Sequence, residues 1–182
     1  MITVIDNFLK KEHFEHIRDW SLSNELQWTY SPSVADDSDV GLGYFVHVLY
    51  KDLEPKSKWI TEGMIAPLME SAKMEILLRA KLNLYPATHT IKYHKPHTDL
   101  PNSHKAAVYC LNTCDGGTTI GKRKIDSVAI RIIFFDGNED HYSSTCTDQP
   151  VRININFNWL TPHTDNTTGA VTHRGSTIDL NP

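Results

Sequence analysis

The residues best suited to chemistry lie in a stretch that begins at His97 and ends at Arg152. One residue separates His97 from Asp99, and side chains two positions apart on an extended strand project to the same face. The two can therefore hold one metal ion from the same side. His141, which arrives from a later part of the chain, would complete a triangle of ligands around that ion.

Two imidazoles and one carboxylate on one face of an octahedral ion leave the opposite face open. This arrangement is typical of non-haem Fe(II) sites at which a substrate and oxygen meet. Arg152 follows eleven positions after His141 and would supply a fixed cation beside the metal. Together the four residues predict an iron site with an anion-binding group.

The overall composition is that of an ordinary globular protein. A chain of 182 residues can bury a core, and we expect one domain over residues 1–182. The formal net charge of -4 gives no general attraction for nucleic acid or for an anionic membrane. The N-terminus lacks the pattern of a signal peptide, and no segment is long and apolar enough to span a bilayer. We therefore expect a soluble, cytoplasmic protein, in which three cysteines, an odd number, would be reduced.

The N-terminal half predicts helices beside a sheet. After a short strand over residues 2–5, apolar residues at helical spacing predict an amphipathic helix over residues 9–22. Residues 31–43 are rich in Ser, Pro, Asp and Gly and are a candidate lid. An apolar stripe that starts after Pro55 and reaches Ile76 predicts one long helix packed on the sheet.

The remaining segments predict short strands separated by turns, which is typical of an antiparallel sandwich or barrel. These strands are expected over residues 44–53, 82–86, 90–94, 106–111, 127–135 and 151–160, with a turn at Gly116-Gly117. In the last strand, odd-numbered residues from Val151 to Trp159 are apolar, and even-numbered residues from Arg152 to Asn158 are polar. In a jelly-roll cleft such a polar face lines the site. The tail, residues 161–182, shows no clear period.

In order and spacing these motifs resemble those of 2-oxoglutarate- and Fe(II)-dependent dioxygenases, and most closely the small prolyl-4-hydroxylase-like domains of phages and marine bacteria. The resemblance is carried by Leu84-Tyr85-Pro86, His97-Thr98-Asp99, Val108 to Asn112, Asp115 to Thr118, Ile132 to Asp136, His141 and Arg152. The ordered match covers about residues 81–160. It implies an α+β, mainly β fold: a double-stranded β-helix (jelly roll, cupin-like) with N-terminal helices packed on one sheet.

The resemblance also implies a role for each site residue. Three residues would hold Fe(II): His97, Asp99 and His141. The planar guanidinium of Arg152 would pair with the far carboxylate of 2-oxoglutarate. Tyr85 would donate its hydroxyl to the same carboxylate, and Asn154 is a further candidate because it shares a face with Arg152. Cys110 stands where such proteins often have a second tyrosine near the cosubstrate.

The implied cofactors are Fe(II), 2-oxoglutarate as cosubstrate and O2, with ascorbate as an optional reductant. The reaction would release succinate and CO2. Related halogenases usually have a small residue at the position of Asp99, so its carboxylate favours hydroxylation. By family analogy the leading substrate is a peptidyl proline or another protein or amino-acid side chain. A small-molecule substrate stays open, the oligomeric state is unknown, and the resemblance suggests a phage-encoded protein that acts inside a bacterial host.

Two other metal sites stay open at the level of sequence. His94 and His97 could form a zinc-binding pair with His104 nearby, but this hypothesis gives Arg152 no role. A second possibility is a zinc site in which Cys110 and Cys114 provide two ligands. Cys146 is the one further cysteine that could join them. For these cysteines, buried free thiols are the favoured interpretation.

Two more alternatives concern a phosphate site and a protein without catalysis. A phosphate cradle at Gly116-Gly117 is disfavoured, because no helix or lysine follows in the required pattern. The alternative function is a jelly-roll protein that binds a metal or a small acid without turnover, such as a phage accessory or structural protein. An intact set of ligands together with Arg152 favours the enzyme.

Overall fold

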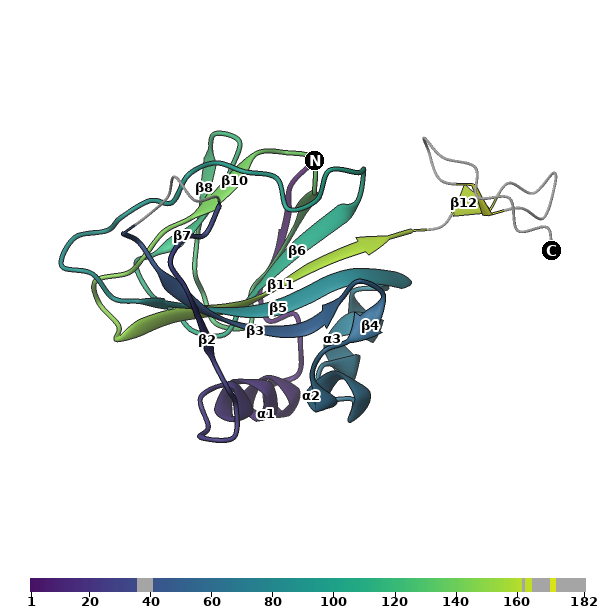
Figure 1. Cartoon of the computed structure of the whole chain (residues 1–182), viewed down its shortest axis with the longest axis horizontal. Helices are drawn as coiled ribbons and strands as arrows, with labels where there is room; N and C mark the ends of the chain where they lie inside the picture. The colour runs from purple at the N-terminus through teal and green to yellow at the C-terminus, as the bar shows by residue number, and fades with distance from the viewer. Residues whose placement is uncertain (36–40, 162, 165–170, 173–182) are drawn as a thin grey trace.

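Two antiparallel β-sheets face each other in the computed structural model, which describes residues 1–35, 41–161, 163–164 and 171–172 (Figure 1). The larger sheet runs in the order β1-β9-β6-β11-β5-β3-β2, with β4 paired to β3. Its strands are β1 (Thr3–Ile5), β2 (Thr29–Ser31), β3 (Tyr44–Lys51), β4 (Glu54–Pro55), β5 (Ile76–Pro86), β6 (Lys105–Cys110), β9 (Ile132–Asp136) and β11 (Val151–Leu160). The smaller sheet, β10-β7-β8, consists of β7 (Gly117–Ile120), β8 (Arg123–Asp126) and β10 (His141–Ser143). A further pair is formed by β12 (His163–Thr164) and β13 (Val171–Thr172).

Three short helices cover the outer face of the larger sheet (Figure 1). They are α1 (Lys11–Ser21), α2 (Lys58–Thr61) and α3 (Ala66–Ser71). Ile17 of α1 and Leu68 of α3 are buried in one apolar core with Phe157 of β11, and each such side chain contributes about 1.5–3 kcal/mol by leaving water. Among the described residues, no helix is long and apolar enough to cross a membrane. The predicted α+β jelly roll with helices on one sheet is confirmed.

Strand β11 lies between β5 and β6 and organises the larger sheet. Its apolar residues, Ile153, Ile155, Phe157 and Trp159, belong to the core beneath the helices. Since side chains alternate along a strand, its polar residues face the smaller sheet instead. Those residues, from Arg152 to Asn158, are also buried. The predicted polar face therefore lies inside the sandwich, where a site can form.

The prediction of one long helix from Pro55 to Ile76 is wrong. Pro55 belongs to β4 and Ile76 begins β5. Between them, α2 is followed by Gly63 at φ 75°, a left-handed conformation that commonly ends a helix. Lys73 at φ 52° then follows α3 and turns the chain into β5. The apolar stripe was real, but it belongs to two short helices and the start of a strand.

Three smaller expectations also differ from the structure. Residues 90–94 form no strand, and Tyr93 makes an isolated bridge to Ser144. Strand β9 begins at Ile132 and not at residue 127, because the chain turns at Ile130 with φ 67°. Gly117 begins β7 and is not in a turn. The smaller sheet was not predicted as such, since its strands have only three or four residues each.

Two predictions fall partly outside the described residues. Of the candidate lid, residues 36–40 lie outside the described residues, as does most of the tail, residues 161–182. Both stay predictions.

Candidate metal and cosubstrate site

The backbone holds His97 and His141 side by side. Each residue's N–H donates to the other's carbonyl oxygen at 3.0 Å, and the two ring centroids lie 4.8 Å apart. The Nδ1 atom of each ring lies 3.1 Å from a backbone oxygen, that of Lys95 for His97 and that of Glu139 for His141. A carbonyl only accepts, so each Nδ1 donates, and in the neutral ring each Nε2 then keeps its lone pair. Both Nε2 atoms are therefore prepared to bind a metal.

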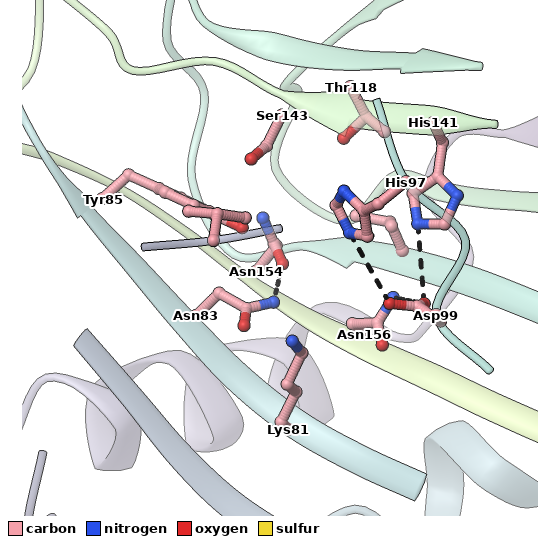
Figure 2. Close-up of a pocket in the computed structure, with 12 residues that line it drawn as sticks. Lys81, Asn83, Tyr85, His97, Asp99, Thr118, His141, Ser143, Asn154 and Asn156 are labelled. Carbon is pink, nitrogen blue, oxygen red and sulfur yellow. Dashed lines mark hydrogen bonds and ion pairs between the residues drawn. The ribbon is translucent and has the colours of Figure 1, made fainter. Parts of the chain in front are cut away.

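Asp99 completes the triangle that the sequence predicted (Figure 2). Its carboxylate oxygens lie 3.9 Å from Nε2 of His97 and 3.5 Å from Nε2 of His141. One ligand atom from each residue lies within 4.8 Å of the other two. Two neutral nitrogens and one carboxylate oxygen on one side of a common point are the donor set of a facial metal site. The structure thus brings the three predicted ligands together.

Three polar residues that the sequence did not single out hold Asp99 in place. Arg79 forms an ion pair with its carboxylate, and the amide nitrogens of Asn156 and Asn158 both donate to Oδ2 at 3.0 Å. Burial by itself would raise the pKa of Asp99, but the neighbouring His141 and the positive charges of Arg79 and Lys81 lower that pKa well below its usual range. Asp99 is therefore an oriented carboxylate at neutral pH.

The environment of His97 favours the neutral imidazole that a metal requires. Burial lowers the pKa of His97, although the hydrogen bond to Lys95 works in the opposite direction. A neutral ring binds a metal without first losing a proton. The donor types, their orientation and their protonation states all fit an Fe(II) ion.

Arg152 lies at the other end of the polar face and is completely buried, with 0% of its surface exposed. Its guanidinium donates to Oγ1 of Thr118 at 2.8 Å and to the carbonyl of Ser144 at 3.3 Å. Gly116 permits this packing, because a Cβ atom there would lie 3.0 Å from the Arg152 Cδ. Within the described part of the chain no carboxylate pairs with Arg152, and its Nε has no hydrogen-bond partner.

A buried charge is normally paired, because removal from water costs several kcal/mol. The unpaired state of Arg152 therefore indicates a binding position for an anion. This is the fit that a diacid cosubstrate requires: its near end at the metal and its far carboxylate at the guanidinium.

Tyr85 lies beside Arg152, as we expected from the sequence. Its ring stacks on Tyr44 with 5.4 Å between centroids, and the Arg152 guanidinium lies 5.2 Å from its ring centre. Burial raises the pKa of Tyr85, so its hydroxyl stays a donor. Asn154 lies between these groups and the metal ligands, and its Oδ1 accepts a hydrogen bond from Asn83 at 2.9 Å. Five of the six predicted site residues line one cavity, and Arg152 contacts Tyr85 and Thr118 in its lining. The roles of all six stay predictions.

One cavity joins the metal ligands to this polar face (Figure 2). Its walls include Lys81, Asn83, Tyr85, Thr118, Ser143 and Asn154, as well as the three predicted ligands. The free volume is about 30 Å³, so a bound cosubstrate requires these side chains to move apart. Burial lowers the pKa of Lys81 to about 8. Sequence analysis missed Lys81, although it has the same strand phase as Tyr85.

The two zinc sites considered from the sequence, one with His94 and His104 and one with the three cysteines, do not form as expected among the described residues. Among the described residues, neither His94 nor His104 joins the group around Asp99. His94 lies against Ser143, and its Nδ1 and the Ser143 hydroxyl are 2.9 Å apart. The three cysteines are buried free thiols, and Cys110 does not lie with the other two: Cys114 groups with Cys146 and Asp148.

No protein-family model and no curated protein matches this sequence. Solved structures do match in fold. A 2OG-Fe(II) oxygenase family oxidoreductase from Burkholderia pseudomallei is 11% identical, with a TM-score of 0.65 over 87% of this chain and 84% of that chain. A Pseudomonas putida prolyl-4-hydroxylase is 12% identical, with a TM-score of 0.58 over 88% of this chain and 92% of that one.

A third match is HygX from Streptomyces hygroscopicus, whose structure holds nickel, 2-oxoglutarate and hygromycin B. It is 8% identical, with a TM-score of 0.58 over 87% of this chain and 82% of that chain. At such low identities the likeness establishes the fold and not the activity. The chain has the prolyl-4-hydroxylase-like jelly-roll fold of the 2OG-Fe(II) oxygenases.

Proposed function

We propose that this protein is an Fe(II)- and 2-oxoglutarate-dependent oxygenase that hydroxylates a peptidyl prolyl or another protein or amino-acid side chain. One observation carries the proposal. The three predicted metal ligands line one cavity, and a fully buried arginine, which has no acid partner among the described residues, contacts Tyr85 and Thr118 in the lining of that cavity. A structural metal site would not need the buried cation, and a simple anion site would not need the triad.

The chain's own residues have distinct tasks in this proposal. His97, Asp99 and His141 would hold the metal, and the bound metal would supply the activation of O2 that couples decarboxylation of 2-oxoglutarate to oxidation of a C–H bond. Arg152 fixes the far carboxylate of the cosubstrate through a planar pair of donors. Tyr85 keeps its proton and donates to the same carboxylate. Thr118 and Ser144, which hold the guanidinium in the structure, set its orientation.

The anchoring of Asp99 supports a catalytic metal. A ligand that is already fixed by Arg79, Asn156 and Asn158 loses little freedom when the metal binds. The three protein ligands leave open positions for a chelating cosubstrate and oxygen. The fold shared with a prolyl-4-hydroxylase supports a side chain of a peptide as the substrate, and this part rests on analogy.

The proposal is tested by turnover. Purified protein is incubated with Fe(II), 2-oxoglutarate, ascorbate and O2, with and without a library of proline-containing peptides and free amino acids. We expect succinate formation that at least one library member stimulates, and a product that has gained one oxygen atom. Stimulated succinate formation without any hydroxylated product would refute the hydroxylase. No succinate from protein that has bound both iron and 2-oxoglutarate would refute the oxygenase.

A further inference from the structure

Lys81 places an ammonium group in the cavity on the side of the predicted metal ligands. Along β5 it has the same phase as Asn83 and Tyr85, and it also lines the cavity. The strand register sets Lys81 opposite Asn156 of β11, the residue whose amide holds Asp99. Figure 2 shows the side chain pointing into the space between Asn83 and Asn156.

Arg152 lies further along the polar face of β11, in contact with Tyr85 and Thr118, which line the cavity. It pairs in register with Tyr85, four residues along β5 from Lys81, which corresponds to about 13 Å along an extended strand. A diacid held at the metal and at Arg152 extends toward Tyr85 and away from Lys81. Lys81 is therefore a cation that lines the cavity, whereas Arg152 contacts two of the lining residues, Tyr85 and Thr118, and the proposed cosubstrate would account only for Arg152.

Lys81 has no acid of its own among the described residues. Within the described ranges its Nζ makes no hydrogen bond or ion pair, and it lies 5.8 Å from the ring centre of Tyr44. Asp99 exerts an attractive charge on it, but Arg79, Asn156 and Asn158 already hold that carboxylate. The two cations of β5 therefore differ: Arg79 orients the predicted ligand Asp99, whereas Lys81 faces the cavity.

We propose that Lys81 anchors a carboxylate of the substrate, so that the substrate is an acid whose oxidised carbon lies near its carboxylate. The acid is either an amino acid or peptide end with a free α-carboxylate, or a peptide with an acidic side chain next to the oxidised residue. This inference rests on the proposed function and narrows its substrate class. A partly desolvated cation gains strongly from such a partner, and truncating one member of a close charge pair weakens binding by roughly 30-fold or more.

The test uses binding to protein loaded with Zn(II) and 2-oxoglutarate, which undergoes no turnover. Three pairs of probes differ in one charge: N-acetyl-proline and its amide, N-acetyl-leucine and its amide, and the capped dipeptides Pro-Glu and Pro-Gln. The first two pairs present an α-carboxylate and the third a side-chain carboxylate, so they distinguish the two sources. Calorimetry measures each probe against wild type, Lys81→Met, Lys81→Arg and Lys51→Met. Lys51 is a matched control because it is an exposed lysine on the neighbouring strand β3.

We expect at least one acid to bind wild type and Lys51→Met at least tenfold more tightly than its neutral partner. Lys81→Met should reduce that preference to less than twofold, Lys81→Arg should keep most of it, and the affinity for 2-oxoglutarate should change less than twofold in all variants. Equal binding of acid and neutral members in every pair, or no binding of any acid, would overturn the proposal. A tenfold loss of 2-oxoglutarate binding in Lys81→Met would instead assign Lys81 to the cosubstrate. Failure of wild type to bind 2-oxoglutarate would refute the proposed function, a result that is visible before any probe is added.

Discussion

Replacement of Arg152 by methionine should affect stability and cosubstrate binding in opposite directions. The guanidinium is fully buried, and no acid of the described residues pairs with it. Removing an ion from water costs several kcal/mol. The variant loses hydrogen bonds to Thr118 and Ser144, each worth about 1 kcal/mol. Methionine fills a similar space with apolar atoms. We therefore expect the free energy of unfolding of the metal-free protein to be unchanged or higher, by up to about 3 kcal/mol.

The affinity for 2-oxoglutarate should fall sharply in the same variant. Truncating one member of a buried charge pair costs about 2–5 kcal/mol, which corresponds to a dissociation constant roughly 30-fold to several thousandfold higher. Two assays measure this: calorimetric titration of 2-oxoglutarate into Zn(II)-loaded protein, and the thermal shift that the cosubstrate produces. A ligand at 100 times its dissociation constant stabilises by about 2.7 kcal/mol. At the same ligand concentration, a roughly 30-fold weaker affinity leaves about 0.9 kcal/mol, so the thermal shift in Arg152→Met should be at most about a third of that in wild type.

Arg131→Met is the matched control, because Arg131 pairs with Asp6 at 2.6 Å and is not in the cavity. It should lose about 1 kcal/mol or less of stability and bind 2-oxoglutarate normally. If Arg152→Met were destabilised by more than about 2 kcal/mol while its affinity for 2-oxoglutarate stayed within twofold of wild type, Arg152 would be a structural residue. The anion-site argument would then be wrong.

Three further predictions concern the metal ligands and Lys81. His97→Ala should keep the fold and lose iron-dependent succinate formation. An active variant would refute the assignment of His97 as a metal ligand. Asn158→Leu removes a donor to Asp99 at 3.0 Å, so a metal titration should show about 10- to 100-fold weaker binding; unchanged affinity would contradict the anchoring role. The pKa of Lys81 falls from 10.5 to about 8 on folding, a penalty on the charged form of about 3 kcal/mol. This penalty is present below pH 8 and disappears as pH rises toward 10.5, so the stability advantage of metal-free Lys81→Met over wild type should shrink by about that amount between pH 7 and pH 10.5. Denaturant unfolding at each pH measures this difference, and a constant difference would refute the burial of the ammonium.

The sequence predicted the site better than it predicted the elements around it. The spacing of His97 and Asp99 is a local signal, and the strict alternation from Arg152 to Trp159 marks a strand with one buried polar face. The alternation survives folding because a strand has a fixed period, whereas His97 lies in an isolated bridge and Asp99 in no strand. The position of His141 opposite His97 could be expected only from family resemblance, since the backbone bridge that joins them is a long-range contact.

The errors share a physical cause. An apolar stripe looks alike in a helix and in a buried strand over a few residues, so Ile76 was read as helical and the start of β5 was missed. Because the predicted strand began only at residue 82, Arg79 and Lys81 were not included in it, although both belong to β5. Extending the phase of Tyr85 back along the chain would have put both on the site's face. Asn158 has the phase of Arg152, but no sequence pattern shows that it bonds to Asp99.

The measurement that tests the central claim most directly is an anaerobic titration of Fe(II) and then 2-oxoglutarate into the metal-free protein. A weak visible charge-transfer band forms only when the 2-oxo acid chelates iron. The account predicts this band in wild type, its absence in His141→Ala, and its appearance in Arg152→Met only at much higher 2-oxoglutarate concentration. Folded wild-type protein that binds iron but shows no band with 2-oxoglutarate would contradict the account and leave a metal-binding jelly roll.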